Sequence, residues 1–261
     1  MIKRGKKERY RHEWKYRISE EEHDLLAFRM RGILDPDPNA KAGTYLIRSL
    51  YFDDYWNSAY EEKEGGVLMR KKYRIRIYNY SDKVIRLERK KKFGSYIYKE
   101  SAPLTHNEVF RILNEDYDFL LQSPHRLLQE FYVECVSNLM RPRVIVDYDR
   151  EPWIMDAGTV RITFDRNVRA AIGSFDIFDP TLPTLAVVPP GEMILEVKYT
   201  EFLPQIIRNI IPEGAPEMTA YSKYVMCYEK TAYKNGFEYW CDDGHRTPSV
   251  FAALPKQPQT Q

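Results

Sequence analysis

The sequence predicts an α+β fold in which about eight antiparallel strands close into a β-barrel, with helices packed around it. Charged side chains recur at every second position in several short segments, among them KKYRIRIYN (71–79) and MILEVKY (193–199). A strand sends alternate side chains to opposite faces, so each charged set shares one face. Tight turns join several of the segments, which favours antiparallel pairing, and closure into a barrel removes exposed edges.

In the first part of the chain, strands alternate with short helices. Residues 10–18 alternate like a strand, and Ser19 with Glu22 forms a capping box that begins a helix. Residues 44–54 are rich in aromatic and β-branched residues and predict a strand. A short helix follows over 57–66 and ends at a pair of glycines.

The middle of the chain predicts three consecutive strands, at 67–79, 83–92 and about 95–101. Thr105 and Glu108 form a second capping box, which opens a helix to about residue 114. A longer helix is predicted over 123–139, with Pro124 in its first turn, where proline is tolerated. These elements place a meander of strands before a helical segment.

Strands resume at 141–150, 160–170 and 192–199. The Pro-rich stretch before the last of them, residues 179–192, is predicted to be a loop. Helices are expected over 203–211 and 219–235. We divide the chain into a basic lead (1–9), one domain (10–240) and a peripheral or disordered tail (241–261).

Composition limits the class of protein. The net charge is only +2 although 30% of residues are charged, so any strong field must come from arrangement. This argues against a nonspecific nucleic-acid coat. The three cysteines have no metal-ligand spacing, no apolar run reaches the roughly 18 residues of a membrane span, and no secretory signal is apparent. A cytoplasmic location is therefore expected.

Alternation alone leaves open whether the charged face lines a lumen or meets solvent. Half-buried strands normally turn charge outward. Here the polar faces carry Arg-x-Arg and Glu-x-Lys patterns, carboxylates are interleaved with the cations, and the opposite faces are aromatic and aliphatic. We therefore expect the charge to face inward, where gathered cations suit a polyanion such as a phosphate chain.

Seven segments, taken in order, resemble the VTC-type polyphosphate polymerase domain of the CYTH, or triphosphate tunnel metalloenzyme, superfamily. The resemblance spans about residues 9–234 and implies a barrel tunnel with metal-dependent chemistry on triphosphates. The segments are EWKY (13–16), SLYFDD (49–54), KYRIRIY (72–78), LERKKK (87–92), VRITFDRNV (160–168), LEVKY (195–199) and YSKY (221–224). Arg11 stands where the wider superfamily has its first acidic residue, which fits the polymerase branch better.

The resemblance implies a set of site residues. It gives Glu196 the role of metal ligand, for Mn²⁺ or Mg²⁺, and a hard carboxylate oxygen suits either ion. Lys15, Lys99 and Ser222 match substrate-binding positions. We add Glu13 and Glu88 to the substrate site, as groups that orient nearby cations or bind metal. The residues matching the phosphate-gripping, catalytic positions are Arg74, Arg76, Lys90, Arg143, Arg161 and Lys223.

These residue types suit phosphoryl transfer, which needs positioning and charge neutralisation by Arg, Lys and a divalent cation. The expected activity is transfer of the terminal phosphoryl group of ATP to a growing polyphosphate chain. The alternatives are a metal-dependent phosphatase for triphosphates or polyphosphate, and a non-catalytic module binding polyphosphate or inositol phosphates. Nucleic acid is not expected, since the aromatics alternate onto the face opposite the cations. A membrane partner in another chain is left open.

Overall fold

The structure, a computed structural model, describes residues 12–40, 42–94, 96–200, 202–211 and 222–232. One antiparallel sheet contains all ten strands, and eight of them follow the order β1-β10-β8-β7-β3-β4-β5-β6. β2 pairs with β7, and β9 with β8. The strands are β1 (His12–Ser19), β2 (Asp35–Pro36), β3 (Tyr45–Asp53), β4 (Met69–Tyr78), β5 (Ser81–Phe93), β6 (Tyr96–Leu104), β7 (Arg141–Met155), β8 (Val160–Ala171), β9 (Thr184–Ala186) and β10 (Glu192–Tyr199).

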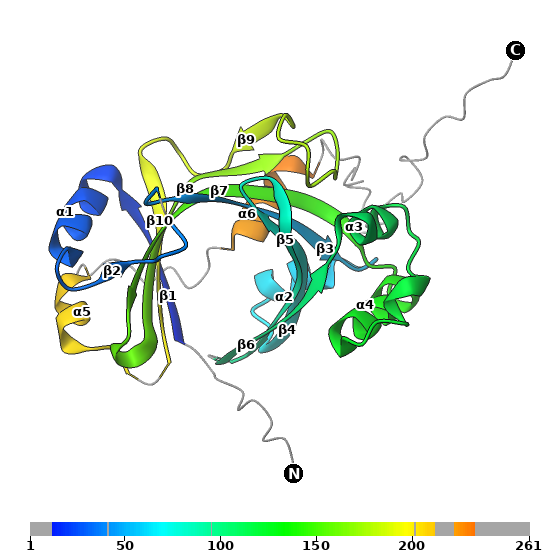
Figure 1. Ribbon diagram of the computed structural model, residues 1–261, viewed down its shortest axis with the longest axis horizontal. Coiled ribbons are helices and arrows are strands. Elements are labelled where there is room, and N and C mark those ends of the chain that lie inside the picture. The colour runs from blue at the N-terminus through cyan, green and yellow to red at the C-terminus, as the bar shows by residue number, and fades with distance from the viewer. Residues whose placement is uncertain (1–11, 41, 95, 201, 212–221, 233–261) are drawn as a thin grey trace, which may run out of the picture.

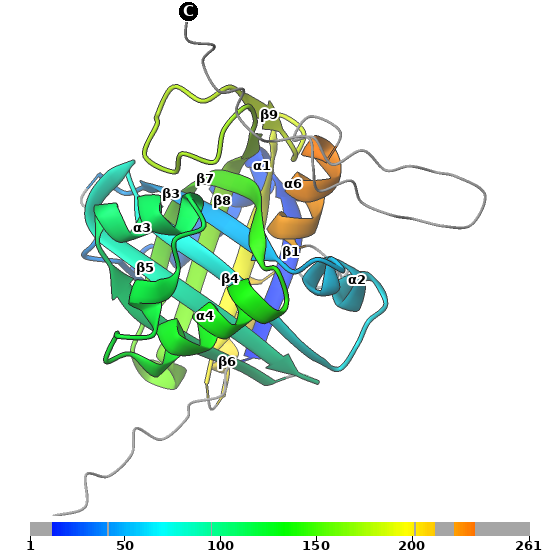
Figure 2. The same ribbon diagram turned by 90° about the vertical axis from the view of Figure 1, so that its right-hand side faces the viewer.

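The helices lie around this sheet (Figures 1 and 2). Among the described residues, none of them is both long and apolar enough to cross a membrane. The α-helices are α1 (Glu20–Met30), α2 (Ser58–Glu64), α3 (His106–Leu113), α4 (Arg126–Ser137), α5 (Gln205–Ile210) and α6 (Lys223–Thr231), and two short 3-10 helices span Asp118–Leu120 and Ala157–Thr159.

The predicted α+β class and the large antiparallel sheet of about eight strands are confirmed. Both capping boxes are present, with Ser19 accepting from the Glu22 amide and Thr105 from the Glu108 amide. The β4–β5 turn places Asn79 and Tyr80 at φ of 51° and 56°. Two adjacent left-handed residues match the right-handed twist of a two-residue hairpin.

The structure departs from the predicted elements in several places. α4 begins at Arg126, after Pro124, because His125 is extended and its amide donates to the Ser123 hydroxyl. β7 runs to Met155, five residues past the predicted end at 150, because its last residues pair with β8 and β2. The predicted loop at 179–192 contains the short strand β9. The lead (1–9), the tail (241–261) and both ends of the predicted 219–235 helix lie outside the described residues.

Closure of the barrel is not seen in the backbone. Within the described ranges, no ladder of hydrogen bonds joins the terminal strands β1 and β6. The sheet is nevertheless strongly curved, and its two ends bend toward each other (Figure 1). Lys90 on β5 reaches Glu13 on β1, with 2.7 Å between ammonium nitrogen and carboxylate oxygen. Side chains therefore connect the two limbs of the sheet.

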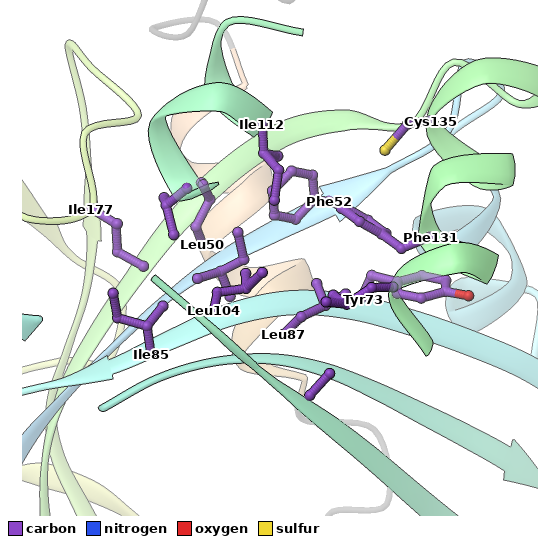
Figure 3. Close-up of a cluster of buried hydrophobic side chains, with 14 of the residues drawn as sticks. Leu50, Phe52, Tyr73, Ile85, Leu87, Leu104, Ile112, Phe131, Cys135 and Ile177 are labelled. Atoms are coloured by element: carbon purple, nitrogen blue, oxygen red, sulfur yellow. The ribbon is translucent and has the colours of Figure 1, made fainter. Parts of the chain in front are cut away.

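The convex face of the sheet is apolar and carries most of the helices. α3 and α4 cover β3 to β6, where Phe131 of α4 contacts Phe52 and Tyr73 edge-on or tilted (Figure 3). On β1, β8 and β10, a second apolar cluster packs against α1 and α5. On the opposite, concave face, a third apolar cluster packs against α6. The charged side chains lie beside this cluster, where Arg74 and Arg76 contact its members Tyr51 and Tyr148.

We predict that Phe131→Ala lowers the free energy of unfolding by about 3 to 5 kcal/mol, because it leaves a cavity between α4 and the sheet. Phe131 is fully buried. Val133→Ala on the same helix is the control, since Val133 is 52% exposed, and it should change stability by at most about 0.5 kcal/mol. Urea titration measures both. Equal losses would show that α4 does not pack as described.

Candidate active site on the concave face

The concave face of the sheet gathers cations from neighbouring strands. Lys72, Arg74 and Arg76 alternate along β4, and their apolar neighbours in sequence belong to the convex core. Arg74 lies directly opposite Glu88 of β5, and Lys72 opposite Lys90. The prediction that these charges face inward therefore agrees with the structure, and the outward alternative does not.

Arg74 and Arg76 are held by hydroxyls and one carboxylate. Arg74 donates to Glu88 at 2.8 Å and to the Tyr51 hydroxyl at 2.8 Å. Arg76 donates to the Ser49 hydroxyl at 3.1 Å and the Tyr148 hydroxyl at 2.9 Å. Both guanidinium groups are thus fixed in orientation, with arginine's flat fork presented on one face.

Glu88 is the carboxylate at the centre of this half of the site. Besides Arg74, it pairs with Lys99 of β6 and lies 4.0 Å from Arg76. Burial alone would raise the pKa of Glu88, but Arg74, Arg76 and Lys99 outweigh burial and hold that pKa far below its usual range. Glu88 therefore stays ionised and offsets the repulsion among the three neighbouring cations.

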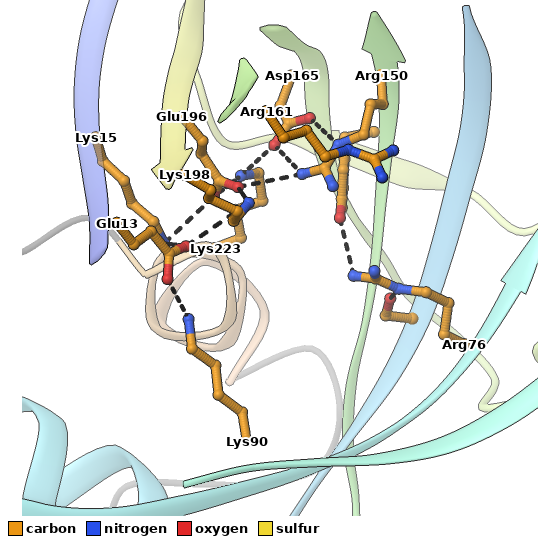
Figure 4. A network of polar contacts seen from close by, with 12 residues as sticks. Glu13, Lys15, Arg76, Lys90, Arg150, Arg161, Asp165, Glu196, Lys198 and Lys223 are labelled. Atoms are coloured by element: carbon orange, nitrogen blue, oxygen red, sulfur yellow. Dashed lines mark hydrogen bonds and ion pairs between the residues drawn. The ribbon is translucent and has the colours of Figure 1, made fainter. Parts of the chain in front are cut away.

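A second carboxylate, Glu196 on β10, is surrounded by four cations (Figure 4). Its oxygens lie 3.3 Å from Lys15, 3.1 Å from Lys223 and 3.3 Å from Arg150, and it also pairs with Lys198. Burial alone would raise its pKa, but the surrounding cations keep the pKa of Glu196 well below the usual range.

Glu13 joins the two halves of the concave face. It lies 3.3 Å from Lys15 on its own strand and 2.7 Å from Lys90 across the opening (Figure 4). Burial would raise its pKa, yet Lys15, Lys90 and Lys198 hold the pKa well below the usual value. The expected role of Glu13 and Glu88 in orienting cations agrees with these contacts.

The N-terminus of α6 closes one side of the site. Ser222 caps the helix, accepting from the Val225 amide at 3.5 Å, and its hydroxyl also accepts from Lys72 at 3.3 Å. Lys223 lies 2.6 Å from Asp165 and sits over the Tyr148 ring. Both helix residues predicted for the site therefore reach the concave face.

The two later arginines differ in position. Arg161 pairs with Asp37 at 2.6 Å and donates to the Tyr45 hydroxyl, and it lies directly opposite Lys198 in the β8–β10 ladder. Arg143 instead donates to the Asn57 side chain and to a backbone carbonyl before α2. The contacts of Arg143 thus place it beside α2, outside the network of Figure 4.

Several residues of the network were not predicted. Arg150 and Asp165 form a bidentate pair at 2.7 Å and both contact the cluster around Glu196. Lys198, two residues after Glu196, was expected on the same face by strand alternation but was not assigned to the site. The remaining additions are Lys72, Tyr51 and Tyr148.

Three lysines of the site, Lys72, Lys99 and Lys198, have depressed pKa values, and burial is the first cause for each. Burial is the main cause for Lys72, whose pKa falls to about 7. Burial likewise lowers the pKa of Lys99 to about 8, against the opposing pull of Glu88. The charged and polar groups facing Lys72 are Asp53, Lys63, Arg70, Lys90 and Ser222. The concave face thus holds more buried cations than its carboxylates neutralise.

Within the described residues, no group of three His, Cys, Asp or Glu side chains is arranged to hold a metal ion. Glu196 nevertheless has a hard-oxygen neighbour, because Thr163 lies directly opposite it in the β8–β10 ladder. The Thr163 hydroxyl is buried and has no hydrogen-bond partner in the described part of the chain. Glu196 and Thr163 fit Mg²⁺ or Mn²⁺ if phosphate oxygens supply most other ligands.

The chain matches the family model described as the VTC domain over residues 10–232. It belongs to the VTC domain family. No curated protein is significantly similar to it. The family predicted from the seven sequence segments is thereby confirmed.

The solved structures to which the chain is similar are distant from it in sequence. A putative adenylyl cyclase from Hippeastrum, described as having a dominant triphosphatase activity, is 13% identical with a TM-score of 0.51 and covers 85% of this chain and 96% of its own. A putative adenylate cyclase from Bacillus halodurans is 10% identical, with a TM-score of 0.47 and coverage of 82% and 92%. A protein from Pyrococcus horikoshii OT3 is 12% identical, with a TM-score of 0.46 and coverage of 85% and 99%.

We predict that Glu196→Gln lowers the free energy of unfolding by about 3 to 5 kcal/mol at neutral pH, because buried cations lose their shared partner. The folded pKa of Glu196 lies below its unfolded value, so the unfolded state takes up the proton first as pH falls. The difference in the free energy of unfolding between wild type and variant is therefore largest at neutral pH and becomes smaller below about pH 4.

Chemical denaturation at several pH values measures this effect. Glu192→Gln is the control on the same strand, because Glu192 pairs with Arg17 near the surface. This control should leave the unfolding midpoint nearly unchanged. A stability loss for Glu196→Gln that is independent of pH would contradict an ionised Glu196 in the folded protein.

Proposed function

We propose that the chain is a divalent-metal-dependent polyphosphate polymerase, which transfers the terminal phosphoryl group of ATP to a growing polyphosphate chain. The observation that carries the proposal is the line of cations along the concave face, from Lys15 and Lys223 to Arg76 and Lys99, in which Lys223 and Arg76 are buried. Membership of the VTC domain family supports the same substrate class.

The geometry suits a triphosphate in an extended arrangement. Arg74 and Arg76 are already oriented by Tyr51, Tyr148 and Ser49, so they can take phosphate oxygens without reorganising. Preorganised cations stabilise the charge that spreads over the transferred phosphoryl group in the transition state. Lys223, Lys15 and Arg150 gather around Glu196 and would bind the phosphates on the other side.

Glu196, with the Thr163 hydroxyl beside it, would hold Mn²⁺ or Mg²⁺ together with the phosphates. When bound, such an ion neutralises charge on the phosphate oxygens during transfer. Four cations already surround the Glu196 carboxylate, so the protein alone offers a divalent ion little net attraction. The ion is therefore expected to arrive with the nucleotide.

We further propose that the curved sheet encloses the substrate as a tunnel. The contact of Lys90 with Glu13 would act as a side-chain closure between the limbs, in place of a backbone ladder. A polyphosphate chain crossing this opening competes with Glu13 for Lys90. An extended product could leave along the concave face while its end stays bound.

Hydrolysis on the same scaffold is the second candidate. It is favoured by the triphosphatase activity given for the Hippeastrum protein that shares the fold. Incubation of the purified protein with ATP and Mn²⁺ separates the two, with polyphosphate read on stained gels and free phosphate measured in parallel. Chain growth supports the polymerase, phosphate release alone supports the phosphatase, and no ATP consumption refutes both.

We predict that Arg76→Lys lowers kcat/KM for ATP by about 100-fold or more, because lysine keeps the charge but loses the planar fork. Arg126→Lys is the control, since Arg126 lies on α4 with its side chain 88% exposed. Steady-state kinetics with the metal in excess measures both variants. Activity in Arg76→Lys equal to that of the control would remove Arg76 from the substrate site.

We predict net proton uptake by Lys72 when inorganic tripolyphosphate binds at pH 8. A nearby polyanion raises a lysine pKa, and the pKa of about 7 leaves most Lys72 side chains neutral before binding. Calorimetry in buffers of different ionisation heat counts the protons. Lys72→Met should lower that count relative to wild type, whereas Lys71→Met, on the opposite face and paired with Glu134, should not. The same count in both variants would contradict the assignment.

A further inference from the structure

Three neighbouring strand ends carry a row of exposed apolar side chains. Met69 begins β4, Phe93 ends β5 and Tyr96 begins β6, and the three lie side by side in the sheet register. Leu68 is adjacent, because its carbonyl accepts from the Gly94 amide at 3.1 Å. These four residues form what we call the apolar tip, with exposures of 69% for Leu68, 67% for Met69, 61% for Phe93 and 50% for Tyr96.

Cations lie immediately behind the apolar tip. The next register row pairs Arg70 with Lys92, and the row after it pairs Lys71 with Lys91. We call these four residues the basic band. Lys71 and Lys91 have acidic partners, Glu134 and Glu100.

The charge around Lys92 is unbalanced. Burial, followed by the nearby charges of Arg70 and Lys90, lowers the pKa of Lys92. An approaching anion would relieve this crowding. The band thus favours a negatively charged surface at the place where the apolar tip ends.

We propose that the apolar tip and the basic band form a docking surface for an anionic lipid membrane. The apolar tip lies outermost and the basic band lies behind it. A bilayer has the matching order, because apolar side chains enter the acyl boundary and cations stay with the lipid phosphates. Lysine and arginine stems are long enough to keep their charge at that level.

Other occupants fit less well. A polyphosphate chain would use the basic band but gains nothing from Leu68 and Met69. A single-stranded nucleic acid could stack on Phe93 and Tyr96, but stacking gives no role to the aliphatic side chains beside them. A lipid surface gives a role to both the apolar tip and the basic band.

Docking at this surface also bears on the active site. Phe93 and Lys90 lie on the same strand end, three residues apart, and Lys90 spans the opening to Glu13. A membrane held at the apolar tip would therefore lie close to the Lys90 end of the concave face. The inference does not depend on catalysis, and its test is made without nucleotide or metal.

The experiment is co-sedimentation of the full chain with vesicles of phosphatidylcholine, alone or with about one third phosphatidylglycerol. We expect binding to the anionic vesicles, weakened by salt, and little binding to the neutral ones. The paired change Leu68→Ser with Phe93→Ser should weaken binding by about tenfold or more. Arg70→Glu with Lys92→Glu should do the same through charge.

The matched control is Leu25→Ser with Phe28→Ser, an exposed apolar pair on α1 at 51% and 71% exposure. It should bind anionic vesicles like wild type. All variants change exposed or partly exposed side chains, and circular dichroism with thermal melting verifies their folding. If one pair fails to fold, the other pair still decides.

Three results would overturn the proposal. The first is no binding of the wild-type chain to anionic vesicles. The second is equal binding by the wild type and a folded variant of either the apolar tip or the basic band, or an equal loss in the α1 control. The third is binding of a single-stranded oligonucleotide through the tip residues with vesicle binding absent.

Discussion

Every feature of the site depends on how a folded sheet can tolerate many cations on its inner face. Unpaired buried charge is costly, and the structure meets this cost with a few carboxylates that each serve several cations. Glu196 contacts four of them, and Glu88 and Glu13 contact three each. The cations are held in place before any substrate arrives, because the carboxylates fix their positions.

The helices on the convex face bury apolar side chains of the sheet, and this burial offsets the free-energy cost of gathering charges on the inner face. α3 and α4 on one side, and α1 and α5 on the other, bury the alternate side chains of the same strands that carry the charges. Each strand therefore contributes to the core and to the site at once. This coupling explains why Arg74 and Arg76 flank Ile75 in sequence, with Ile75 fully buried and the arginines on the opposite face.

Strand alternation was enough to predict the eight long strands. The inward charge was predicted from the Arg-x-Arg and Glu-x-Lys patterns, the interleaved carboxylates and the apolar opposite faces. Alternation did not predict the pairing of Arg150 with Asp165, because a pair across two strands depends on their register, which cannot be read from the sequence. Arg143 shows a second limit. The β3–β7 register shifts between Tyr51 and Phe52, so alternation cannot be counted through that point to Arg143. The way in which the limbs of the sheet meet could not be predicted from alternation either. The contact between Lys90 and Glu13 bridges the opening through side chains, which a strand pattern does not reveal.

The shared carboxylates have a consequence for substrate binding. A triphosphate that draws Lys15, Lys198 and Lys223 toward itself takes those cations from Glu196. A buried carboxylate that loses its partners is strongly destabilised. Phosphate binding at this site is therefore unfavourable unless another cation takes the place of the lysines beside Glu196. A divalent ion that travels with the phosphates meets this need, because it can bind Glu196 and phosphate oxygens together. The metal dependence that we propose then follows from the charge balance of the protein as well as from the chemistry of the proposed phosphoryl transfer.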